Sequence, residues 1–116
     1  MKIRIKGNSL RYRLTQSDVK HFVTEGYIEE TTNFGNRVFT YALQRSIDDQ
    51  LDAEFNGDKI TLFMPCVLAG QWYNTDIIGF EHHTPTLYLL VEKDFVCLDN
   101  TLEDQSDNYP NPNMVC

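Results

Sequence analysis

Apolar and polar positions alternate at the start of the chain. Residues 1–6 carry an apolar side chain at each odd position and a basic one at each even position, and residues 10–14 resume the alternation with Arg11 and Arg13 on the polar side. A period of two is typical of a β-strand that buries one face. We therefore expect two hairpin strands, or one strand kinked at Gly7, whose basic side chains share the outer face.

Residues 15–26 change to the spacing of a helix. Thr15 and Asp18 have the pattern of a capping box, and Gly26 suits the left-handed position that follows a helix. Between them, apolar residues recur at intervals of three and four, at Val19, Phe22 and Val23. The pattern predicts a helix of about ten residues.

A second, weaker helix is predicted over residues 65–73. Pro65 suits its first turn, and the apolar residues at helical spacing are Leu68, Ala69 and Trp72. Cys66 lies in the first turn, but no neighbouring His or Lys completes a reactive pair with it. We therefore expect Cys66 to be a small buried residue.

Two hairpins are predicted outside the helices. Residues 27–44 contain two segments rich in β-branched and aromatic residues, joined by a loop with Gly and Asn. The second hairpin turns at Asn56-Gly57, a strong turn signal. Its expected register sets Glu54 opposite Lys59, because this pairs opposite charges on one face.

Residues 87–91 are apolar without interruption and lie between Pro85 and the charged residues 92–94. A short run of this kind predicts a strand buried on both faces at the centre of a sheet. We therefore predict a single α+β domain with a mainly antiparallel sheet of six to eight strands and two short helices. No internal repeat is visible in the sequence.

Composition narrows the class of protein. The chain has 116 residues, of which 41% are hydrophobic, and a net charge of −7. This acidity disfavours general attraction to nucleic acids and to anionic membranes. No window of about 18 apolar residues could cross a bilayer, and the alternating start does not resemble a secretion signal. Three widely spaced cysteines do not form a disulfide framework, so we expect a cytoplasmic protein.

The charge is distributed unevenly along the chain. Five of the ten basic residues lie in residues 1–13, whereas everything after Lys93, from Asp94 onward, is acidic or neutral. We expect the two ends to pair within one fold, although exposed ion pairs are individually weak. We also expect residues 99–116, which contain Pro110 and Pro112, to form an extended acidic strap along the surface. A basic two-stranded ribbon can also read a DNA groove, but the total charge favours a solvated face.

A metal site is the sharpest chemical alternative. Imidazole and thiolate groups bind transition metals, and the candidate ligands are His82, His83, Cys97 and Cys116, with Asp99, Asp104 and Asp107 as further donors. The spacing argues against it, because no CxxC or HxxxH pattern is present and an extended strand from His83 to Cys97 spans roughly 45 Å. The acidic run also lacks the alternation of a calcium loop.

No motif of a known enzyme chemistry is present. Trp72 is a weak candidate for stacking on a ligand, although a tryptophan at helical spacing is typical of a core. We expect no cofactor. The favoured interpretation is a non-catalytic binding or interaction module for an unknown protein or small-molecule partner, with a homodimer through an edge strand as a further hypothesis. The alternatives are metal binding and an enzyme with a pocket near Trp72.

Three segments resemble a known family. They are the opening MKIRIKGNSLRYRLT, the middle FTYAL and the closing VEKDFVCLDNTLEDQSDNYPNP. These segments are similar to a family of short, uncharacterised bacterial proteins that is classed as a domain of unknown function. The resemblance covers nearly the whole chain, implies one cytoplasmic domain, and brings no catalytic or binding residues with it.

Overall fold

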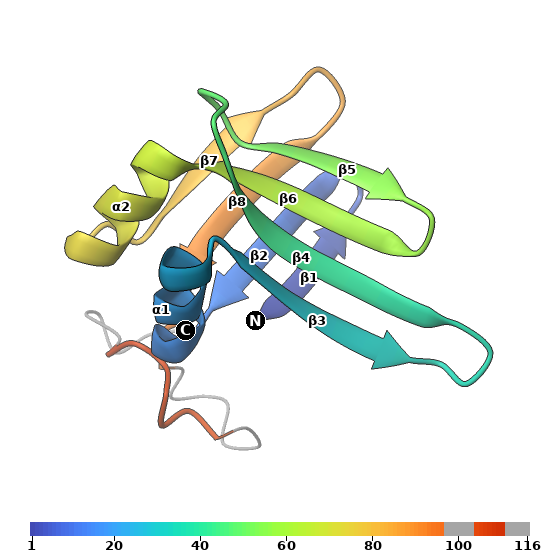
Figure 1. Cartoon of the computed structure of the whole chain (residues 1–116), viewed down its shortest axis with the longest axis horizontal. Helices are drawn as coiled ribbons and strands as arrows, with labels where there is room; N and C mark the ends of the chain where they lie inside the picture. Colours follow the sequence, from blue (N-terminus) through green and yellow to red (C-terminus); the bar gives the residue numbers. More distant parts are fainter. Residues whose placement is uncertain (97–103, 111–116) are drawn as a thin grey trace.

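The computed structural model describes residues 1–96 and 104–110. The described part contains two sheets of four strands and two helices, which confirms the predicted α+β class. Figure 1 shows the sheets lying one over the other, with both helices at one end. The elements are β1 Lys2–Lys6, β2 Ser9–Leu14, α1 Gln16–Glu25, β3 Tyr27–Asn33, β4 Val38–Ser46, β5 Asp52–Asn56, β6 Lys59–Pro65, α2 Cys66–Asn74, β7 Gly79–His83 and β8 Tyr88–Lys93.

The second half of the chain repeats the element order of the first. Each half is a hairpin, a helix and a second hairpin, and β1, β2 and α1 begin 50 positions before β5, β6 and α2. The hairpin registers also correspond: Lys2 pairs with Arg13, and Asp52 pairs with Phe63, 50 positions later in both strands. The expectation that the chain has no internal repeat is therefore wrong at the level of structure.

The two halves are joined by exchanging hairpins. Sheet A has the order β1-β2-β8-β7 and sheet B the order β3-β4-β6-β5, so each sheet combines one hairpin from each half. The strands at each junction run parallel. Both sheets are therefore mixed, which corrects the prediction of one mainly antiparallel sheet. The junctions differ by two residues in register, since Leu10 pairs with Leu89 but Ile60 pairs with Tyr41.

The core lies between the sheets and under the helices, and it draws on equivalent positions of both halves. Phe22 on α1 and Trp72 on α2 are both fully buried, and so are Leu14 and Met64 at the ends of β2 and β6. Each of these pairs is separated by 50 positions. The duplication therefore extends from the backbone to the packing of the largest side chains.

Both ends of helix α1 are formed as the sequence predicts. Thr15 and Asp18 form both hydrogen bonds of a capping box. Gly26 has φ of 76°, and its N–H donates to the carbonyl oxygen of Phe22, a geometry that glycine adopts without strain. Helix α2 begins at Cys66, which is exposed rather than buried, so the prediction for this cysteine is wrong.

Strand β8 has the predicted interior position, between β2 and β7. Its burial alternates, however: Leu89 and Val91 are fully buried on the inner face, and Leu90 is partly exposed on the outer face. The expected burial on both faces is wrong because, in the described part of the chain, no helix covers the outer face of sheet A. The register predicted for the β5–β6 hairpin is wrong by two residues, since Lys59 pairs with Asn56. An even shift leaves every side chain on its expected face.

We expect the protein to lose stability at alkaline pH because it buries tyrosine side chains. Tyr12 is fully buried, and burial raises the pKa of its hydroxyl well above the ordinary value. Because the unfolded chain loses this proton near pH 10 and the folded chain keeps it, the free energy of unfolding should fall above about pH 10, by about 1.4 kcal/mol per pH unit for each such tyrosine. For Tyr12→Phe, the free energy of unfolding, measured by urea titration from about pH 9 to 11, should fall less steeply than for the wild type. Equal slopes would contradict this assignment.

Candidate functional site

The outer face of sheet A carries most of the basic charge near the start of the chain. Because strand residues alternate between faces, the pairings of β1 and β2 put five basic side chains on this face: Lys2, Arg4, Lys6, Arg11 and Arg13. We call these five side chains the basic face. Tyr88 and Leu90 of β8 lie beside them, since Ser9 pairs with Tyr88 and Arg11 with Leu90.

Part of this charge is compensated within the protein. Arg11 Nε lies 2.6 Å from Glu92 Oε1, and Arg13 Nε lies 2.9 Å from the same oxygen. Lys2 Nζ lies 3.1 Å from Asp94 Oδ2, a carboxylate that is almost fully buried. The C-terminal end of β8 and the residue that follows it therefore hold three of the five cations.

Arg4 and Lys6 are different. Both are exposed, and neither side chain forms a hydrogen bond or ion pair with any residue in the described ranges. They line a shallow depression of about 230 Å³ together with Arg11, Tyr88 and Leu90. The hydroxyl of Tyr88 donates to Glu81, a bond that raises the pKa of Tyr88 and keeps it protonated. The depression thus combines the positive charge of Arg4 and Lys6 with an aromatic ring and aliphatic side chains.

The fold does not require basic residues at these positions. In the equivalent hairpin of sheet B, Lys2 corresponds to Asp52 and Arg4 to Glu54, in the same backbone register. The outer face of sheet B also carries Glu29, and its one lysine, Lys59, donates to the hydroxyl of Tyr27 at 2.6 Å. The duplicated scaffold therefore has one basic outer face and one acidic outer face.

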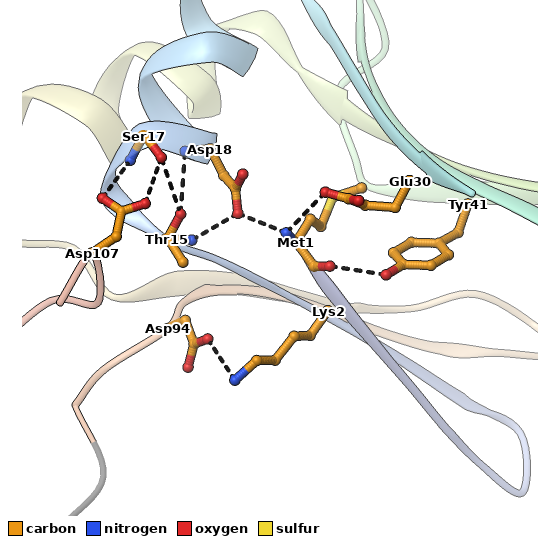
Figure 2. Close-up of polar contacts among 9 residues, drawn as sticks. All are labelled: Met1, Lys2, Thr15, Ser17, Asp18, Glu30, Tyr41, Asp94 and Asp107. Carbon is orange, nitrogen blue, oxygen red and sulfur yellow. Dashed lines mark hydrogen bonds and ion pairs between the residues drawn. The ribbon is translucent and has the colours of Figure 1, made fainter. Parts of the chain in front are cut away.

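The start of β1 is fixed by a polar network, shown in Figure 2. The amino group of Met1 lies 2.7 Å from Asp18 Oδ2 and 3.3 Å from Glu30 Oε1, and the hydroxyl of Tyr41 donates to the carbonyl oxygen of Met1 at 2.9 Å. Asp18 also accepts from the backbone N–H of Thr15. The strand that carries Arg4 and Lys6 is thus tied to α1, β3 and β4.

The described part of the acidic C-terminal segment lies against α1. The backbone N–H of Gln16 donates to the carbonyl oxygen of Asp107 at 3.0 Å, and the hydroxyl of Ser17 donates to the Asp107 carboxylate (Figure 2). The hydrogen bond from the Ser17 hydroxyl to the Asp107 carboxylate holds the pKa of that carboxyl below its usual value. Of residues 104–110, none has an ion pair to the basic face, and the expected pairing of the two ends is formed by Lys2 with Asp94.

The metal candidates do not converge in the described part of the chain. His82 and His83 are neighbours on β7 and point to opposite faces, and the ring of His83 lies 4.4 Å from that of Tyr88. Residues 1–96 and 104–110 contain no group of three or more His, Cys, Asp or Glu placed to hold an ion. Cys97, Asp99 and Cys116 lie outside the described residues.

Trp72 is fully buried, and its indole N–H donates to the carbonyl oxygen of Ile78 at 2.9 Å. The side chain is therefore part of the core and presents no open face. The sequence shows the alternation of basic residues in β1, and we interpreted it as a solvated face. The sequence does not show that Arg4 and Lys6 lack partners among residues 1–96 and 104–110, since this depends on where Glu92 and Asp107 lie.

Fold and site together define a class: a duplicated two-sheet α+β domain with oppositely charged outer faces. Within the described residues, no helix is long and apolar enough to cross a membrane. The chain belongs to a family of unknown function, DUF7009, whose model matches residues 1–113, and this confirms the resemblance to an uncharacterised family. No curated protein and no solved structure matches the chain.

Proposed function

We propose that this protein is a non-catalytic binding module that docks an acidic partner protein on the basic face. The observation that carries the proposal is the pair Arg4 and Lys6, which are exposed and uncompensated within the described part of the chain. Surface cations without partners attract anions, and they steer association before contact. Tyr88 and Leu90 beside them supply the apolar contact that stabilises the bound complex against dissociation.

A protein partner is favoured over a nucleic acid. The net charge of −7 and the acidic residues on the outer face of sheet B, Glu29, Asp52 and Glu54, repel a long polyanion. A folded or peptide partner with a local acidic patch meets the basic face without approaching sheet B. The expected cytoplasmic location belongs to the same proposal. The homodimer is a competing hypothesis, which size-exclusion chromatography with light scattering tests.

Charge reversal on the basic face tests the proposal. The probe is a short fluorescent polyglutamate peptide, and binding is measured by fluorescence anisotropy at about 20 and about 200 mM salt. We expect the double variant Arg4→Glu/Lys6→Glu to bind at least about tenfold more weakly than the wild type at low salt, because two attractions become repulsions. The wild-type affinity should itself fall with added salt.

A matched control separates the surface from the total charge. Lys20 on α1 and Arg37 beside β4 are both exposed and lie outside sheet A. The variant Lys20→Glu/Arg37→Glu changes the net charge by the same four units and should bind within about twofold of the wild type at low salt. An equal loss in both variants, or no binding by the wild type, would overturn the proposal.

A further inference from the structure

We propose, on the basis of that function, that the acidic partner binds as an extended segment added to the edge of sheet A along β1. Strand β1 is the first strand in the order β1-β2-β8-β7 and pairs only with β2 among the described strands. An edge strand has a row of backbone N–H and C=O groups free on one side. Strand addition satisfies these groups and is a recurrent mode of peptide recognition.

The side chains of β1 define the sequence that would fit. Lys2, Arg4 and Lys6 point to the outer face, and Ile3 and Ile5 point to the inner face. Ile5 is 59% exposed although it faces inward, so the inner surface next to β1 is open. A neighbouring strand places its side chains about 5 Å from those of β1 on each face. The complement is therefore a segment in which acidic and apolar residues alternate.

The other edges of the two sheets are less suited to an acidic strand. The outward residues of β5 include Asp52 and Glu54, β3 carries Glu29, and β7 carries Glu81. Like charges on directly opposite residues are destabilising. Within the described residues, β1 is the edge on which cations alternate with apolar residues. Its start is also held in place by the network of Met1 with Asp18 and Glu30.

A second copy of this chain is the competing occupant, because β5 has the alternation Asp52-Ala53-Glu54-Phe55. However, β1 lies beside β3, through Met1 and Glu30, whereas β5 is at the opposite end of sheet B. Pairing of β1 with β5 between copies would therefore be head-to-tail and would join several molecules into a ring or an open chain. The net charge of −7 on each copy opposes such growth, so a separate partner is favoured.

The experiment compares two peptides of equal composition and charge. In one, glutamate and valine alternate; in the other, the glutamates precede the valines. If the partner adds a strand, the alternating peptide should bind about tenfold more tightly, because two or three cross-strand pairs form only in that order. Hydrogen exchange of the β1 amides should slow with the alternating peptide.

Backbone methylation makes the test specific for strand addition. In a strand, alternate N–H groups point to the same edge, so methylating every glutamate nitrogen or every valine nitrogen should abolish binding in one case and spare it in the other. Equal binding of both parent peptides overturns strand addition. That result leaves the docking proposal standing, because docking is tested separately by the binding of polyglutamate to the wild type and to the Arg4→Glu/Lys6→Glu variant. The protein alone could also form larger assemblies as its concentration rises. If Arg4→Glu abolishes these assemblies, the occupant of the β1 edge is a second copy of this chain, and the proposal of a separate partner is overturned.

Discussion

Replacing Gly79 by alanine is expected to destabilise the protein by about 3 kcal/mol. Gly79 is the first residue of β7 and pairs with Glu92 of β8. A Cβ atom at this position would overlap the carbonyl oxygen of Val91 and lie 2.7 Å from Cα of Glu92. Both obstacles are backbone atoms, so the added methyl group could be accepted only by displacing one strand from the other. Urea unfolding followed by circular dichroism measures the loss.

Gly70 provides the matched control. It lies inside α2, and a Cβ atom there would meet nothing within 4 Å. Gly70→Ala should therefore stabilise the protein by up to about 1 kcal/mol, because alanine loses less backbone entropy in a helix than glycine. Opposite signs for the two glycines are the expected result. A change of less than about 1 kcal/mol for Gly79→Ala would contradict the close approach of β7 and β8.

Local patterns in the sequence predicted local structure well. The capping box of Thr15 and Asp18 and the glycine that ends α1 are confirmed, because each depends on residues within one turn of the chain. The β5–β6 register was misjudged because Glu54 and Lys59 share a face and invite direct pairing, whereas the actual turn uses Gly57 with φ of 61°. Charge attraction between exposed residues is weak beside the geometry of a two-residue loop.

Long-range organisation was beyond the reach of these patterns. Which hairpins share a sheet depends on contacts between β2 and β8 and between β4 and β6, which are far apart in the sequence. The duplication is concealed because the two halves preserve burial rather than residue identity. Phe22 corresponds to Trp72 in the core, while exposed Lys2 corresponds to Asp52. A fold constrains its buried positions most strongly, so the outer faces were free to acquire opposite charges.

The candidate site was predictable only in part. The alternation of basic residues in β1 follows from the sequence, and so does its outward direction. What the sequence cannot supply is the set of partners: Glu92 compensates Arg11 and Arg13, and Asp107 bonds to Ser17. Among the described residues, these placements distinguish Arg4 and Lys6, which have no partner there, from the cations that form ion pairs within the fold.

Trp72→Ala is expected to cost about 3–5 kcal/mol of unfolding free energy, the typical loss for removing a fully buried aromatic side chain. Trp72 is the largest fully buried side chain of the described core. The loss is a large fraction of the total stability of a small domain, about 5–15 kcal/mol, so the variant should unfold at much lower urea concentration. Far-UV circular dichroism is the measurement, since the substitution removes the only tryptophan of the chain.

Two further substitutions identify the cause of this loss. Trp72→Phe keeps an aromatic ring, as at the equivalent Phe22, and removes the N–H bond to Ile78. The carbonyl oxygen of Ile78 still accepts from the backbone N–H of Lys93 at 2.9 Å, so the cost should be only about 1–2 kcal/mol. Tyr73→Ala, at the exposed neighbour, should change stability by about 0.5 kcal/mol or less. If Trp72→Ala behaved like Tyr73→Ala, the indole would not be a core residue, and its assignment to ligand binding would have to be reconsidered.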